Sequence, residues 1–342
     1  MQTATLRNIY DHEGPFATVY FESRSPAEDA EHQLALRWDE LRNRLAQDGA
    51  TESALEQLDE AVRAPEPTEV QATGKVLVAN SRGVIFDQAF DASQGSGDQA
   101  YWQDEPELGD YLRERERLVQ MLVVIADQTG ATIRQQIVGP SHRVEQRASQ
   151  HIDGDDAVSK PRENGLPHAK IQHHADEVIK QNLREVADHV RQTVRDWRPD
   201  VVVLAGEVQG SSALRDELAE DQLPLVGIDK GGTVDEAAEA VLAEELLELA
   251  QELIDQRAQD NADRYEYGQA HDTALAGAEF VAQAAEQGAV QTLLLEYDRP
   301  AAQEPALIAA AIRTGADTEL IDTEVDDGVA ALLRFEAAPV SG

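Results

Sequence analysis

The chain of 342 residues is strongly acidic, with 66 Asp and Glu against 29 Lys and Arg and a formal net charge of −37. Hydrophobic residues make up 42% of it, which excludes a disordered acidic tail and allows two or three domains, each with its own core. It contains no cysteine, which excludes disulfides, thiolate metal sites and a cysteine nucleophile. The acids are spread along the whole length. This pattern predicts adaptation to a high-salt cytoplasm, where a Debye length of ~3 Å at molar salt screens their repulsion.

Residues 1–16 hold no apolar signal core, and no run approaches the roughly 20 apolar residues that span a bilayer. We therefore expect a soluble, cytoplasmic protein with no membrane partner.

The first region of the chain predicts one strand and two helices. The strand is expected over 17–22, and the helices over 26–46 and 53–64. The first helix begins with Ser25-Pro26-Ala27-Glu28, a capping box with proline at the first helical position. Residues 64–68 contain two prolines and predict a linker.

The second region begins at Lys75 and alternates apolar strands with polar turns. After them, residues 139–167 have little apolar periodicity and predict a long loop. Apolar residues then recur at helical spacing from Ile171 to about Trp197. The strands are expected over 76–79, 84–90, 120–126, 131–138 and 201–205, the last of them fully apolar and therefore central in a sheet.

The third region follows Gly231-Gly232. Thr233 and Glu236 form a capping box that predicts a long acidic helix to about Gln259. The rest predicts helices over 273–287 and 305–313 and strands over 289–296, 319–323 and 329–335.

Alternating strands and helices predict a layered α/β (α+β) fold. The breaks in the pattern divide the chain into an N-terminal domain over 1–68, a central domain over 72–230 and a C-terminal domain over 231–342.

Residues 159–184 locally reverse the charge of the chain. Five basic side chains stand there against three acidic ones, and three of the five lysines of the protein lie among them. Cations retained against such an acidic background predict a phosphate-rich partner such as RNA. The basic residues are Lys160, Arg162, Lys170, Lys180 and Arg184, and the acidic ones are Glu163, Asp176 and Glu177.

Histidines in the same segment supply ligand types that zinc accepts. His168, His173 and His174 lie near Asp176 and Glu177. The HExxH spacing is absent, so the pattern favours a solvated or RNA-facing helix start over a metal site.

Residues 204–212 form an apolar strand that runs through glycines toward a helix, a turn that can hold a phosphate. It lacks the Lys-Ser/Thr ending of a P-loop, and Glu207 would repel an anion. The pattern favours a tight strand-to-helix turn with Ser211 or Ser212 as the helix cap.

The order of these parts resembles a known family. Asp200-Val201-Val202-Val203-Leu204-Ala205-Gly206 follows the long helix, and Gly231-Gly232, Asp272-Thr273-Ala274-Leu275 and residues 287–295 come after it. Over about residues 75–335 the chain resembles the archaeo-eukaryotic class I release factors and Pelota. It is more similar still to their divergent bacterial-type branch, which includes the mycobacterial and Balon-like ribosome hibernation factors. The resemblance implies three domains, with a mixed-sheet central domain and an α/β C-terminal domain.

In release factors of this family, a loop of the central domain carries Gly-Gly-Gln into the peptidyl-transferase centre. Here that motif should fall near Gly165-Leu166-Pro167, and its glutamine is missing; Gln172 is the nearest one. The resemblance therefore implies a factor without enzymatic activity or cofactor that occupies the A site of idle or stalled ribosomes. Two alternatives stay open: a peptidyl-tRNA hydrolase, release or rescue factor that uses Gln172 or a histidine, and a metal-dependent hydrolase built on the three histidines.

The resemblance also implies partners and a site. The main partner is the ribosome, with 23S rRNA near the peptidyl-transferase centre. The C-terminal domain is expected to contact a translational GTPase or the stalk base of the ribosome, and the protein is expected to be a monomer. The residues expected to bind rRNA are His142, Arg143, Arg147, Ser159, Lys160, Arg162, Asn164, Gly165, His168, Lys170, Gln172 and His173.

Overall fold

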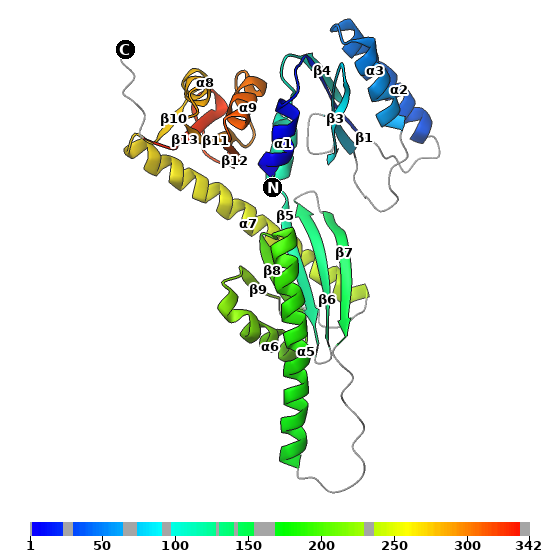
Figure 1. Cartoon of the computed structure of the whole chain (residues 1–342), viewed down its shortest axis with the longest axis vertical. Coiled ribbons are helices and arrows are strands. Elements are labelled where there is room, and N and C mark those ends of the chain that lie inside the picture. Colours follow the sequence, from blue (N-terminus) through cyan, green and yellow to red (C-terminus); the bar gives the residue numbers. More distant parts are fainter. Residues whose placement is uncertain are drawn as a thin grey trace. The chain divides into compact units, whose positions relative to one another are not determined.

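The computed structural model describes residues 2–22, 30–63, 74–90, 97–127, 130–139, 143–153, 168–228 and 236–335. The chain forms two compact units (Figure 1). Unit 1 combines an N-terminal lobe, Met1–Glu116, with a C-terminal lobe, Asp255–Gly342, and unit 2 is Arg117–Ile254. The described residues form three sheets, each with helices, which confirms the α/β class.

The N-terminal lobe contains a four-stranded sheet with the order β3-β2-β1-β4, antiparallel throughout. Trp38, Leu45 and Leu58 of its helices α2 and α3 pack with Val19 and Leu77 of the sheet. The elements are α1 Gln2–Tyr10, β1 Phe16–Glu22, α2 Ala30–Gln47, α3 Glu52–Arg63, β2 Gly74–Asn80, β3 Gly83–Phe90, β4 Gln99–Gln103 and α4 Gly109–Glu116.

The hairpin β2–β3 corrects the sequence-based organisation. We predicted it at the start of the central domain, but β2 pairs with β1, with Val19 opposite Leu77. The predicted boundary before residue 72 therefore separates strands of one sheet. An apolar run reveals a strand but not which strand will be its neighbour. The start of the helix at Pro26, the linker 64–68 and the capping box at Thr233 lie outside the described residues.

The C-terminal lobe contains a second four-stranded sheet, with the order β10-β13-β11-β12 and a parallel β11–β12 pair. We predicted one helix over 273–287, but the segment forms a short strand and then a helix. Gly277 between them has a φ of +94°, which ends the strand at a conformation that favours glycine. The elements are β10 Ala274–Ala276, α8 Ala278–Glu286, β11 Val290–Glu296, α9 Glu304–Arg313, β12 Asp317–Ile321 and β13 Val329–Leu333.

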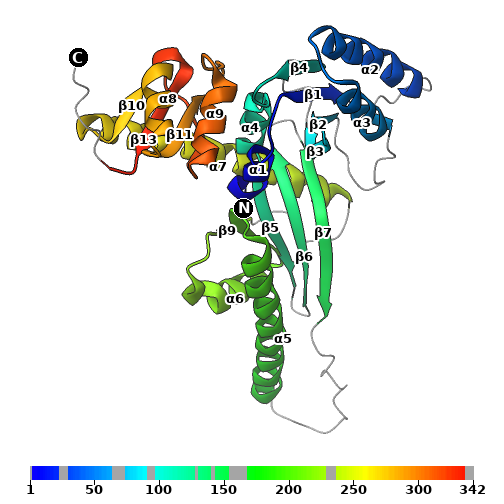
Figure 2. The same cartoon turned by 45° about the horizontal axis from the view of Figure 1, so that its top comes forward.

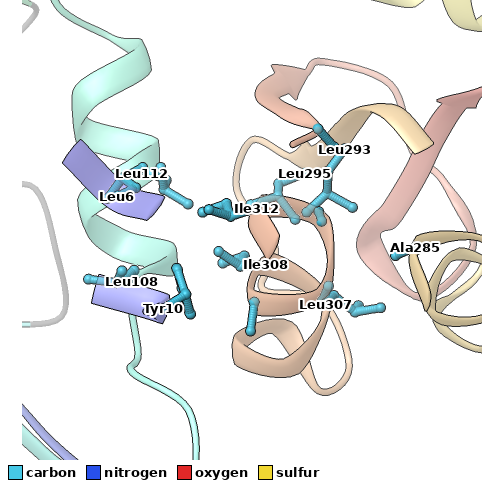
Figure 3. Close-up of a cluster of buried hydrophobic side chains, with 14 of the residues drawn as sticks. Leu6, Tyr10, Leu108, Leu112, Ala285, Leu293, Leu295, Leu307, Ile308 and Ile312 are labelled. Atoms are coloured by element: carbon cyan, nitrogen blue, oxygen red, sulfur yellow. The ribbon is translucent and has the colours of Figure 1, made fainter. Parts of the chain in front are cut away.

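The two lobes of unit 1 share one hydrophobic core. Figure 3 shows Leu6 and Tyr10 of α1, with Leu108 and Leu112 at α4, facing the side chains of α9. On α9, Leu307, Ile308 and Ile312 are almost fully buried. Because apolar surface from both lobes leaves water together, each lobe stabilises the other.

Unit 2 is a mixed five-stranded sheet between helices, as Figure 2 also shows. The sheet has the order β7-β6-β5-β8-β9, with β5 antiparallel to β6 and parallel to β8, which confirms a mixed central sheet. Helices α5 and α6 cover one face, and the first part of α7 covers the other. The elements are β5 Val119–Ala126, β6 Gly130–Gly139, β7 Arg143–Asp153, α5 His168–Trp197, β8 Val201–Gly206, α6 Val208–Leu218, β9 Leu225–Gly227 and α7 Glu236–Ala270, whose last residues belong to unit 1.

The shared core of unit 1 predicts that Ile308→Ala lowers its free energy of unfolding by about 2–5 kcal/mol, because a buried side chain is removed and a cavity remains. Although Ile308 lies in the C-terminal lobe, backbone amides of β1 in the N-terminal lobe should exchange faster with deuterium. Phe280→Ala removes a half-exposed side chain of the same lobe and should change stability by less than about 0.5 kcal/mol. Unchanged exchange in β1 would show that the lobes fold independently.

Candidate nucleic-acid interface

At one end of the central sheet, the ends of several strands lie close together, and one of these strands precedes the cationic segment 159–184 in the sequence. Ala126 pairs with Gly206 and with Ala131, and Gly130 pairs with Asp153. The ends of β5, β8 and β7 and the start of β6 therefore lie together, and we call them the loop end of the sheet. Residues 154–167 follow directly after β7 at this end.

Strand β7 overturns part of the predicted loop. We expected residues 139–167 to lack regular structure, but residues 143–153 pair antiparallel with β6 along its full length. As an edge strand, β7 has one neighbour and is mostly exposed; among its side chains that the structure describes, only Ile152 is buried. An edge strand needs few apolar residues, so its sequence lacks the periodicity of a buried strand.

The strand also separates residues that we predicted in one site. At about 3.3 Å per residue, the 11 residues of β7 place Arg143 roughly 30 Å from Asp153. Arg143 thus lies at the opposite end of β7 from the loop end. Arg147 lies between them, and its Nη1 is 3.2 Å from Oε1 of Glu145. These two arginines therefore do not join the loop end.

Helix α5 carries four predicted site residues near its start. It has 30 residues, which at 1.5 Å each make about 45 Å. Among the residues of α5 whose burial is described, those buried against the sheet run from Leu183 to Val190. Figures 1 and 2 show the first half of the helix extending past the strand ends. His168, Lys170, Gln172 and His173 lie in that first half, and the directions of their side chains lie outside the description.

The remaining predicted site residues lie outside the described residues: His142, Ser159, Lys160, Arg162, Asn164 and Gly165. Their role in binding rRNA stays a prediction.

His151 is a residue at the loop end that our site prediction left out. It lies two positions before the end of β7, is exposed, and its Nδ1 is 3.0 Å from Oγ1 of Thr132 on β6. This hydrogen bond holds the ring beside the point where residues 154–167 begin. The sequence signal was a histidine inside the supposed loop, which gained meaning only with the pairing of β7 and β6.

The glycine turn after β8 is explained by close packing of backbones. A Cβ on Gly206 would lie 2.1 Å from the carbonyl oxygen of Ala126, and one on Gly210 would lie 2.6 Å from that of Asp127. The N–H of Glu207 donates to the oxygen of Ala126. The tight-turn interpretation therefore fits better than a phosphate cradle, because the backbone of β5 occupies the space beside the glycines.

The predicted serine cap of α6 is wrong. The helix begins at Val208 with Glu207 as N-cap, and no side chain caps it. Ser211 lies inside the helix, with its Oγ donating to the oxygen of Val208. Gly210, which packs closely against Asp127, is already in the first turn of the helix, so the helix begins before Ser211 and Ser212.

An ion pair fixes α7 on the other face of the sheet. The guanidinium of Arg134 on β6 binds both carboxylate oxygens of Glu239 at 2.6 and 2.7 Å. These hydrogen bonds hold the pKa of Glu239 below its usual 4.5. The charge of Arg134 is therefore paired with a carboxylate within unit 2.

Neither a metal site nor a membrane span occurs among the described residues. No three His, Asp or Glu side chains there are arranged to hold a metal ion, and the side chains of His168, His173 and His174 are not among them. No helix in the same part of the chain has the length and apolar character to cross a membrane.

A match to a family sequence profile spans most of unit 2 and the following part of α7. Residues 120–271 match the sequence profile of bacterial archaeo-eukaryotic release factor family 2. This match covers less than half of the chain, and over it the chain is similar to the divergent archaeo-eukaryotic release factors. It is 28% identical over 216 residues to an uncharacterized protein of Mycobacterium tuberculosis, found in strains H37Rv and CDC 1551. That match covers 63% of this chain, which spans only 56% of the length of these relatives.

Solved structures of release factors and Pelota proteins also align with this chain. An archaeal translation termination factor matches at 18% identity and a TM-score of 0.24, covering 98% of this chain and 97% of its own. Dom34 of S. cerevisiae matches at 12% identity and a TM-score of 0.43, covering 98% and 93%. Archaeal Pelota, from a model of its ribosome-bound state, matches at 14% identity and 0.43, covering 98% and 95%.

The packing at the glycine turn predicts that Gly210→Ala destabilises unit 2 by about 1–3 kcal/mol, because the added methyl group meets the backbone of Asp127. Alanine is the better helix former, so the intrinsic preference alone would give the opposite sign. Chemical unfolding measures the effect. Ser212→Ala, at an exposed position of the same helix, is the control and should be nearly neutral. A stabilised Gly210→Ala variant would contradict the close approach.

The Arg134–Glu239 pair predicts a pH-dependent contribution to stability. Because the pKa of Glu239 is lowered in the folded state, this contribution is present above pH 4.5 and is lost as the pH falls through the lowered value. Glu239→Gln should therefore be less stable than the parent chain at pH 7, by less than about 1 kcal/mol since the carboxylate is partly exposed, and the difference should shrink below pH 4.5. Unfolding at several pH values measures it, with the exposed Glu244→Gln as control. A difference independent of pH would exclude this pairing.

Proposed function

We propose that this release-factor-like protein is a ribosome-binding translation factor that occupies the A site of idle or stalled ribosomes without hydrolysing peptidyl-tRNA. The supporting observation is the position of the cationic segment 159–184. In the sequence it follows β7, which ends at the loop end of the central sheet, and it includes the first half of α5, within the region that matches the release-factor profile. Its excess of basic residues suits contact with rRNA phosphates in a chain whose net charge is −37.

The charge of the rest of the protein favours a contact confined to this segment. A broadly acidic surface repels a polyanion, and high salt weakens binding that relies on released counterions. A few cations with histidines that stack or hydrogen-bond on bases can still hold an RNA at short range. We propose Lys160, Arg162 and Lys170 as phosphate contacts and His168 and His173 as base contacts.

The sequence of the segment supports occupation of the peptidyl-transferase centre over catalysis there. Residues 154–170 contain no glutamine, and Gln172 lies inside α5. We therefore propose ribosome hibernation as the role of the protein, with 23S rRNA as the immediate contact. A translational GTPase that binds the C-terminal lobe completes the proposal, as the resemblance to Pelota implies.

Co-sedimentation with ribosomes through a sucrose cushion in molar KCl tests the proposal. The wild-type protein should pellet with ribosomes, and the triple variant Lys160→Glu, Lys170→Glu and Arg162→Glu should stay in the supernatant. For single variants that still bind, the logarithm of the binding constant should be plotted against the logarithm of the salt concentration. The slope should be flatter by about one unit for each phosphate no longer neutralised. A matched variant with exposed Arg44, Arg63 and Arg82 changed to Glu carries the same total charge and should still pellet.

Equal loss of binding in both triple variants would mean that total charge, rather than the segment, governs binding, and would contradict the proposal. Absence of wild-type protein from the pellet would do so as well. Peptide release from loaded ribosomes, measured in the same salt, should stay at background. Release that is abolished by Gln172→Ala would favour a peptidyl-tRNA hydrolase instead.

A further inference from the structure

The two lobes of unit 1 are joined by a buried ion pair between distant parts of the chain. Arg113 of α4 and Glu304 of α9 are 191 residues apart. Nη1 of Arg113 lies 2.7 Å from Oε1 of Glu304, and Nη2 lies 2.7 Å from Oε2. Their side chains are only 10% and 4% exposed. The contact is therefore a two-pronged, desolvated pair, the strongest geometry for arginine and carboxylate.

The hydrogen bonds around this pair all cross from one lobe to the other or hold the acceptor in place. Nε of Arg113 donates to the carbonyl oxygen of Glu296, and Nη2 donates also to that of Arg299. Oε2 of Glu304 accepts in addition from the N–H of Ala301. The acceptors of the Arg113 side chain all belong to the C-terminal lobe. That lobe therefore determines the orientation of the planar guanidinium group of Arg113.

The start of α4 also approaches Glu304 closely. A Cβ on Gly109 would lie 1.8 Å from Oε1 of Glu304. Gly109 has no positive φ, so an alanine could adopt its backbone conformation, and only the close approach demands glycine. The position thus offers a way to disturb the pair without removing either charge.

A second contact between the lobes is more exposed. Arg313 of α9 binds both carboxylate oxygens of Glu105 at 2.7 and 2.9 Å and lies 5.6 Å from the ring centroid of Tyr10. Its side chain is 45% exposed, so this contact is screened by salt. Of these two ion pairs, the buried one is therefore the less sensitive to salt.

Apolar burial attracts the lobes but does not by itself fix their orientation, since it is non-directional. A buried ion pair contributes little net attraction after desolvation, but it is satisfied in a single geometry. We propose that Arg113 and Glu304 form a latch that holds the two lobes as one rigid body in solution. Unit 1 then moves as a whole, whichever molecule unit 2 binds, so the proposal is independent of the ribosome.

Pulsed electron–electron resonance of spin labels tests the latch on the full chain. The protein has no cysteine, so two introduced cysteines are labelled without background. The exposed residues Glu60 of α3 and Glu286 of α8 report the distance between lobes, and Glu286 with exposed Asp322 gives a reference within the C-terminal lobe. The distance distribution between lobes should be as narrow as the reference in the wild-type background.

Three variants then separate orientation from stability. Glu304→Gln and Gly109→Ala should both broaden the distribution between lobes and leave the reference unchanged. The double variant Arg113→Met with Glu304→Leu replaces the pair by apolar side chains. It should melt at a higher temperature than Glu304→Gln, because no buried charge is left unpaired, and yet keep the broad distribution.

Two results would overturn the latch. The first is a wild-type distribution between lobes that is clearly broader than the reference. The second is a narrow distribution in the folded double variant, which would show that the apolar core orients the lobes alone. Should Glu304→Gln fail to fold, Gly109→Ala and the double variant still decide the question.

Discussion

Charge is the constraint that governs the side-chain contacts between distant parts of this chain. The chain has 66 Asp and Glu residues and only 29 Lys and Arg residues. Because acids are in such excess, each arginine has carboxylates available as partners. Arg113, Arg134 and Arg313 each bind a carboxylate that lies more than 100 residues away and connect elements that no turn would bring together. Arginine is suited to these contacts because its guanidinium can form two parallel hydrogen bonds with one carboxylate. Salt screens such a pair least where it is buried. Against this background, the segment 159–184, with five basic residues and three acidic ones, departs from the average composition of the chain.

The platform for that segment depends on close backbone packing rather than on charge. Gly206 and Gly210 bring the start of α6 against the end of β5, and the pairing of Gly130 with Asp153 brings the end of β7 to the same place. A binding segment is more precisely placed when it leaves rigid elements than when it leaves other loops. Residues 154–167 begin and end on such elements, β7 and α5. Close packing of these elements therefore fixes both points from which residues 154–167 leave the described part of unit 2.

The sequence predicted those parts of the fold whose signal is local. The apolar runs at β5 and β8 and the helical spacing of α5 were sufficient, because each of these elements shows its buried face in its own residues. The edge strand β7 and the short strand β9 were missed, since they have few buried side chains. Helix α4 was missed for a different reason: Tyr111, Leu112, Arg113 and Glu114 are all buried, so it shows no amphipathic face. The candidate site was limited in the same way, because Arg143 could be separated from the cationic segment only once β7 was known to be a strand.

Helix α4 also shows how a helix with charged residues can determine the contact between the two lobes of unit 1. Four consecutive buried residues, two of them charged, can occur only where other parts of the chain cover several sides of the helix. Here Tyr111 contacts Phe86 and Tyr20 of the N-terminal sheet, whereas Arg113 contacts α9 and the loop before it. A charge buried there without its partner would cost several kcal/mol, so α4 and α9 are compatible in one arrangement and strongly penalised in others. If unit 1 is rigid for this reason, a partner that binds one lobe also determines where the other lobe lies. The proposed binding of a GTPase to the C-terminal lobe would then also fix the position of the N-terminal lobe relative to that partner.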